Sequence, residues 1–110
     1  MNNYTVNYES WSKMNIFEQM GNIYSEVSRA FKAKRENNKQ YEILSVTRAI
    51  GLFDATIDTL IKKNSIRTKE VLRSKDQFIS SLFSEIFNDK DASELEKYFM
   101  YFAIAARIKK

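Results

Sequence analysis

Apolar residues recur at spacings of three and four along most of the chain, which is the pattern of amphipathic helices. With no proline and two glycines among 110 residues, little interrupts such helices from within. The clearest run predicts a helix over Lys39–Lys62, and its regular seam is typical of a helix packed nearly antiparallel to its neighbours. The residues of this seam are Ile43, Val46, Ile50, Phe53, Ile57 and Leu60.

Three further helices are expected on the same grounds. The first begins at a capping box, in which Asn15 caps the free amides and Glu18 follows three residues later. The last begins at a second capping box, made by Asp91 and Glu94. Polar stretches at 37–38, 63–65 and 88–90 separate the helices. The expected helical ranges are 15–36, 39–62, 66–87 and 91–108.

Four helices with short connections predict an all-α fold, an up-down-up-down four-helix bundle. Residues 1–14 are expected to form a short N-terminal arm, which Trp11 could pin to the body, and residues 15–110 a single helical-bundle domain. A three-helix core with a docked fourth helix is the alternative. A chain of this length buries roughly two-thirds of its surface on folding, so an autonomous core is expected.

Two of the expected helices carry more apolar surface than a monomeric bundle needs, and exposed apolar patches usually mark interaction sites. The small residues Gly21, Ser25 and Ser28 would also let another helix approach closely. We therefore expect a homo-oligomer or a protein partner, although the arm could instead cover one of these patches. The residues expected at the interface are Tyr41, Leu44, Leu52, Met100 and Ile104.

The chain has no cysteine and no histidine, which excludes a thiolate nucleophile, a disulfide, an imidazole base and an ordinary zinc site. Helix register places Glu26 level with Arg48, and Asp54 level with Lys75, as in interhelical ion pairs. Together with Asp58, these carboxylates could instead form an oxygen-only metal or acid/base site. Carboxylates with basic neighbours favour the ion-pair interpretation, because a tuned carboxylate needs a like-charged or apolar setting. No cofactor, metal or small-molecule substrate is therefore expected.

The formal net charge is +4, which favours acidic partners. A basic end of the bundle would suit a phosphate backbone, although cations also collect at helix C-termini for intrinsic reasons. No helix-turn-helix signature, glycine-rich loop or RNP-like motif supports specific reading of nucleic acid. The residues of this basic patch are Lys62, Lys63, Arg67, Lys69, Arg107, Lys109 and Lys110.

The apolar stretches are far shorter than the ~20 residues that a membrane span needs. The first ten residues are polar and contain no hydrophobic signal region. We therefore expect a cytoplasmic protein with no membrane partner.

Several runs resemble a group of small uncharacterised all-helical bacterial proteins. They are Trp11-Ser12, residues 17–30 (FEQMGNIYSEVSRA), residues 48–57 (RAIGLFDATI), and the tail segments 97–99 and 105–107. The resemblance covers most of the chain from Trp11 onward and implies a shared helical fold without a known activity. The polar positions that it singles out are Glu26, Arg29, Arg48, Asp54 and Arg107.

These observations predict a non-enzymatic helical-bundle module for protein–protein interaction that associates with itself. The alternative is a nucleic-acid-associated accessory protein that uses the basic end without sequence preference. A carboxylate-based magnesium enzyme is the third hypothesis.

Overall fold

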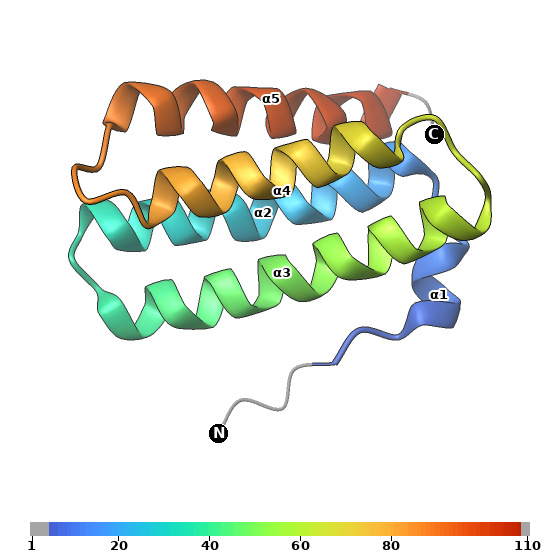
Figure 1. Ribbon diagram of the computed structural model, residues 1–110, viewed down its shortest axis with the longest axis horizontal. Coiled ribbons are helices and arrows are strands. Elements are labelled where there is room, and N and C mark those ends of the chain that lie inside the picture. The colour runs from blue at the N-terminus through green and yellow to red at the C-terminus, as the bar shows by residue number, and fades with distance from the viewer. Residues whose placement is uncertain (1–4, 109–110) are drawn as a thin grey trace.

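The structure is a computed structural model that describes residues 5–108. Over this range the chain is all-helical, as the sequence predicts, and Figure 1 shows the long helices lying side by side with alternating direction. Residues 1–4 and the predicted basic residues Lys109 and Lys110 lie outside the described range. The helices are α1 (Tyr8–Ser12), α2 (Ile16–Arg35), α3 (Lys39–Lys62), α4 (Thr68–Leu82) and α5 (Asp89–Ile108).

Asparagine side chains set the ends of the first two long helices. The Asn15 side chain accepts a hydrogen bond from the Glu18 amide at 2.9 Å, and the Glu18 carboxylate accepts one from the Asn15 amide at 3.0 Å, so the predicted capping box is confirmed. Asn38 caps α3 by accepting from the Tyr41 amide at 3.1 Å. Asn37 ends the preceding helix in the left-handed conformation, at φ 55°, which asparagine tolerates better than most residues.

The prediction was wrong about the two helices that flank the α4–α5 connection. Helix α4 ends at Leu82 rather than Phe87, and the Ser84 hydroxyl donates to the carbonyl of Ile86 in the loop that follows. Such side-chain bonds to nearby backbone compete with helix continuation. Helix α5 begins before Asp91, because Asn88 accepts from the Asp91 amide at 3.0 Å and provides the cap itself.

The expected N-terminal arm contains a helix that was not predicted, α1. Its Asn7 cap accepts from the Ser10 amide at 3.1 Å, and Trp11 is buried against the body. The Trp11 indole N–H donates to the Thr56 hydroxyl of α3 at 2.9 Å, and the Gln19 amide donates to the Trp11 carbonyl at 2.9 Å. Trp11 therefore fastens the arm to both α2 and α3.

A cluster of phenylalanines joins the long helices at the centre of the molecule. Phe31, Phe53, Phe78 and Phe99 come from α2, α3, α4 and α5, and each is fully buried. Ring centroids lie 5.5 Å apart for Phe31 and Phe78, and 5.7 Å apart for Phe53 and Phe99, both with edge-to-face geometry. Such pairs stabilise a protein by more than the burial of their area alone, so this cluster contributes strongly to the stability of the fold.

Helix α3 buries most of the predicted seam, namely Val46, Phe53, Ile57 and Leu60, but its buried arc is wider than that seam. Ile43 was expected in the core but is 62% exposed, whereas Ser45 and Ala49 are buried. Helix α3 packs against α1, α2 and α4, so its buried arc is wider than a single seam. Small side chains such as Ser45 and Ala49 let a neighbouring helix come close, which a pattern of large apolar residues does not reveal.

Two of the three small residues on α2, Gly21 and Ser28, lie against α5 of the same chain, whereas Ser25 is exposed. A Cβ placed on Gly21 would lie 3.1 Å from the Ala103 Cα, closer than most packed Cβ atoms allow. The Ser28 hydroxyl donates to the Glu96 carboxylate at 3.3 Å, and the Arg35 guanidinium donates to the same carboxylate at 2.7 Å. The close approach expected at this strip is therefore made within the molecule.

Candidate functional site

The first candidate surface lies on the N-terminal half of α3 and comprises Tyr41, Ile43 and Leu44, the α3 patch. With Gln40 and Thr47 it lines a shallow hollow of about 440 Å³. Tyr41 and Ile43 are exposed and Leu44 is half-buried. Two of the predicted interface residues, Tyr41 and Leu44, thus lie together at the surface.

The second candidate surface is the outward stripe of α5, formed by Tyr101, Ile104 and Ile108, the α5 patch. These residues follow one another at spacings of three and four, so they share one face of the helix. All are exposed, with Ile104 at 43%. The predicted interface residue Met100 is half-buried and lines a separate hollow with Tyr24.

The predicted orientation of Leu52 was wrong. It is 6% exposed and belongs to the hydrophobic core, because α3 has neighbours on more than one side. The remaining predicted interface residues also do not form one surface. Helix α2 packs on α3 and α5, and α4 packs on the same two helices, so α3 and α5 occupy diagonal positions. The α3 patch and the α5 patch are therefore separate surfaces.

The structure brings together the predicted ion pair between Asp54 and Lys75. The Lys75 ammonium of α4 lies 2.8 Å from the Asp54 carboxylate of α3. The Glu26 carboxylate bonds Arg29 of its own helix at 3.0 Å, and its other oxygen is buried without a hydrogen-bond partner within the described part of the chain. Arg48, on the facing helix, is half-buried.

The predicted carboxylate cluster is dispersed. Asp58 pairs with Lys62 on its own helix at 3.0 Å, while Asp54 bonds Lys75. Between residues 5 and 108 no group of three or more acidic side chains is placed to hold a metal ion. The arrangement of these carboxylates is that of ordinary ion pairs at helix surfaces.

The described residues of the predicted basic patch, Lys62, Lys63, Arg67, Lys69 and Arg107, share one end of the molecule but are divided by carboxylates. Lys62 and Lys63 line a hollow beside Glu9 of α1. Arg107 lines a different hollow beside Glu18, and Lys69 is exposed near the start of α4. Arg67 bonds Glu70 at 3.2 Å. The structure thus distributes these cations around the end instead of collecting them in a single cap.

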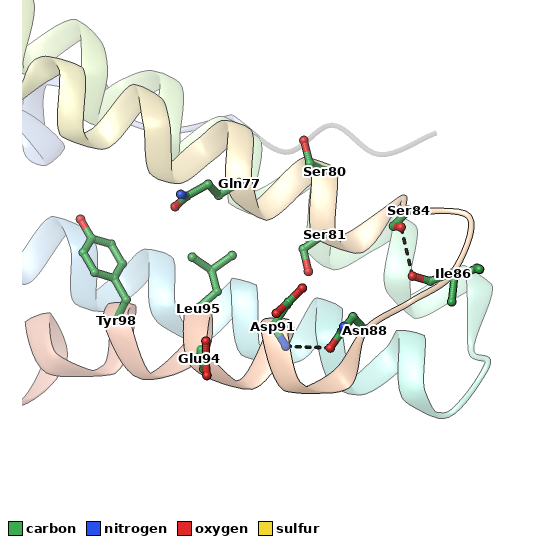
Figure 2. Close-up of a pocket in the computed structure, with 10 residues that line it drawn as sticks. All are labelled: Gln77, Ser80, Ser81, Ser84, Ile86, Asn88, Asp91, Glu94, Leu95 and Tyr98. Atoms are coloured by element: carbon green, nitrogen blue, oxygen red, sulfur yellow. Dashed lines mark hydrogen bonds between the residues drawn. The ribbon is translucent and has the colours of Figure 1, made fainter.

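A third surface, which the sequence did not predict, is a groove of about 600 Å³ between α4 and α5, the α4–α5 groove (Figure 2). The α4 side of the groove is polar, with Ser81 pointing toward α5. A signal was available in the serines of 80–84, which interrupt the apolar pattern of that helix. The residues lining the groove are Gln77, Ser80, Ser81, Ser84, Ile86, Asn88, Asp91, Glu94, Leu95 and Tyr98.

Tyr98 closes one end of this groove. Its hydroxyl donates to the Glu70 carboxylate at 3.1 Å, and the other oxygen of Glu70 accepts from Arg67. Burial, and then the negative charge of Glu70, raise the pKa of Tyr98 above its usual value. Tyr98 therefore remains a neutral hydrogen-bond donor, and the groove offers hydroxyls and carboxylates for a polar or cationic group.

The chain matches no protein-family model, no curated protein and no solved structure. The resemblance to a bacterial group therefore stays a prediction. None of the helices between residues 5 and 108 has the length and apolar character that crossing a bilayer requires.

Proposed function

We propose that this protein is a non-enzymatic helical interaction module that associates with itself in the cytoplasm. Its scaffold in this proposal is an up-down-up-down four-helix bundle to which α1 is added. The observation that carries the proposal is the α5 patch, where three large apolar side chains are exposed in a row.

The chemistry of α5 supports this choice of surface. On its inner side α5 contributes Phe99 to the core, and on its outer side it presents Tyr101, Ile104 and Ile108 to water. Fully burying an aliphatic or aromatic side chain is worth about 1.5–3 kcal/mol, so covering this row gives a substantial driving force. The exposed cations Lys97 and Arg107 flank the row and would form the polar rim that interfaces commonly have.

The same face meeting its counterpart in a second copy gives a closed, two-fold symmetric dimer. An apolar contact of this kind resists salt, because screening weakens interactions between exposed charges and leaves apolar burial intact. Association that persists at high salt is therefore the signature of the α5 patch.

Light scattering on a sizing column, at low and at high salt, tests this proposal. The wild type is expected to keep a dimer mass at high salt, and Ile104→Asp is expected to run as a folded monomer there. The matched control is Ile43→Asp on the α3 patch, which changes an equally apolar exposed residue and should leave the mass unchanged. An Ile104→Asp protein that keeps the wild-type mass at high salt would remove the α5 patch from consideration.

A second candidate function is sequence-nonspecific association with nucleic acid. It is supported by the placement of Lys62, Lys63 and Arg67 at the same end of the molecule as Arg107 (Figure 1). Binding of a fluorescent duplex should then weaken steeply with salt and show little dependence on sequence. Reversing Lys62, Lys63 and Arg67 to glutamate should abolish that binding, and unchanged binding would rule out this end.

A further inference from the structure

The α3–α4 turn, residues 63–67, presents an apolar side chain between cations. Ile66 is 97% exposed and is the most exposed large apolar residue of the described chain. Lys63 and Lys69 lie on either side of it in sequence; both are exposed, and neither makes an ion pair within residues 5–108. Asn64 adopts the left-handed conformation, at φ 53°, which turns the chain so that this segment projects from the end of the molecule.

The α4–α5 groove opens toward the opposite end of the long helices, since the turn precedes α4 and the α4–α5 loop follows it (Figure 1). Asp91 and Glu94 stand on its α5 side (Figure 2), are exposed, and make no ion pair with any described residue. Ile86, 84% exposed, and Leu95, half-buried, add apolar surface to the same groove. The groove therefore combines negative charge with apolar surface, as the turn combines positive charge with an isoleucine.

We propose that the α3–α4 turn of one copy docks in the α4–α5 groove of a second copy of this chain. Ile66 would pack on Leu95, and the flanking lysines would face Asp91 and Glu94. The groove volume of about 600 Å³ lies in the range of pockets that bury whole ligands, so it has room for the tip of a turn. Complementary charge steers such encounters and fixes their register.

This inference rests on the proposed function, self-association, and adds a second contact of a different kind. The α5 patch pairs with itself, whereas the turn and the groove are unlike surfaces. Each copy that uses its turn still offers its groove, so the contact is head-to-tail and builds a chain or a ring. Because its charges are exposed, this contact weakens as salt rises, unlike the contact through the α5 patch.

The test separates the two contacts by using the Ile104→Asp protein as background. At low salt this protein is expected to run above the monomer mass through the end contacts alone, and to fall to the monomer mass at high salt. In this background we add a turn variant, Lys63→Glu with Ile66→Ser, and a groove variant, Asp91→Lys with Glu94→Lys. Each is expected to run as a monomer at low salt, with circular dichroism confirming that it remains helical.

An equimolar mixture of the turn variant and the groove variant is the decisive sample. The turn variant retains an intact groove and the groove variant an intact turn, so the mixture is expected to form a one-to-one dimer. A mixture that stays monomeric, or a single variant that keeps the mass of the background protein, overturns the head-to-tail contact. An Ile104→Asp protein that is already monomeric at low salt overturns it too and leaves the proposed function standing. A wild type that is monomeric at both salts overturns both.

Disulfide trapping provides a second readout that does not depend on charge reversal. The chain has no cysteine, so no native thiol competes with the introduced ones, and homodimeric disulfides of each variant are measured separately. With oxidised glutathione as the oxidant, Ile66→Cys mixed with Ser81→Cys is expected to form the mixed disulfide dimer several-fold faster than Ile66→Cys mixed with Ser93→Cys. Ser93 is exposed on α5 but lies beside Arg35 and outside the groove, which makes it a matched control. Equal rates for the two mixtures would contradict docking in the groove.

Discussion

The α2–α3 seam and the α4–α5 seam belong to the same fold but are filled in opposite ways. Along α2 and α3 the small residues Ala30, Ala33, Ser45 and Ala49 are buried at 0–1% exposure, and these two helices make the most extensive contact between helices in residues 5–108. Between α4 and α5 the small residues are serines that stay at or near the surface, and a polar groove remains. Both seams use small side chains, but those of the α2–α3 seam are buried whereas Ser80 and Ser84 of the α4–α5 seam are exposed to solvent.

The difference suggests that one seam contributes mainly to the stability of the domain and the other is free to bind a partner. A seam closed by alanine gains from burial and close packing, while a seam lined by hydroxyls and carboxylates loses little by staying hydrated. The closed seam is therefore expected to respond strongly to substitution. The open seam is expected to tolerate changes and to be available for a partner.

The largest difference in stability is expected between truncating a leucine in the core around α3 and truncating a leucine in the α4–α5 groove. Leu52→Ala on α3 removes a buried side chain and is expected to cost about 3 kcal/mol of unfolding free energy. Leu95→Ala in the groove removes a half-buried one and is expected to cost about 1 kcal/mol. Urea denaturation followed by circular dichroism measures both. Equal losses would mean that the groove is packed as tightly as the core around α3.

The contact between α2 and α5 provides a second test, because the two helices approach closely at a glycine, Gly21. Gly21→Val would push against the backbone of Ala103 and is expected to destabilise the protein by about 2 kcal/mol, as overpacked cores do. Ser25→Val introduces the same side chain at an exposed position of the same helix and should be nearly neutral. The midpoints of thermal unfolding of the two variants measure this difference. A Gly21→Val protein as stable as the wild type would show that α5 can move away from α2 at this position.

Alkaline pH should lower the free energy of unfolding through Tyr98, which lies at one end of the α4–α5 groove. In the unfolded chain a tyrosine loses its proton near pH 10.0, whereas the raised pKa of Tyr98 keeps it protonated in the folded protein. The unfolded state then binds fewer protons, so stability falls as pH rises above that value. Unfolding free energies measured across this range should show a shallower decline for Tyr98→Phe. The exposed Tyr101→Phe on the same helix is the control, and an equal effect there would contradict the assignment to Tyr98.

The smallest effect is expected at the ion pair that links α3 to α4. Asp54→Asn and Lys75→Gln, combined in a double-mutant cycle, should give a coupling of about 0.5 kcal/mol, because both side chains remain partly exposed. The coupling should shrink in high salt. A coupling of several kcal/mol would show that this pair, and not the phenylalanine cluster, sets the helix register.

Parts of the candidate surfaces could be predicted from the sequence. Tyr41, Leu44 and Ile104 were expected near the surface and lie at or partly at it, and Asp54 was expected beside Lys75. Leu52 and Ile43 were misplaced, because apolar spacing identifies a helical face but not how many neighbours cover it. The serines of 80–84 indicate a polar side of α4, but the groove itself was missed because it depends on how two helices separated by a loop are spaced.

The sequence by itself determined the all-helical fold, the ends of α3 and the capped start of α2. These features depend on interactions within a few residues, such as the Asn15–Glu18 capping box. The tertiary structure decided the docking of α1 through Trp11 and Thr56, which are 45 residues apart. It also decided which arc of α3 is buried and where a seam stays open. Those outcomes depend on which surfaces meet across the fold, and local periodicity contains no information about that.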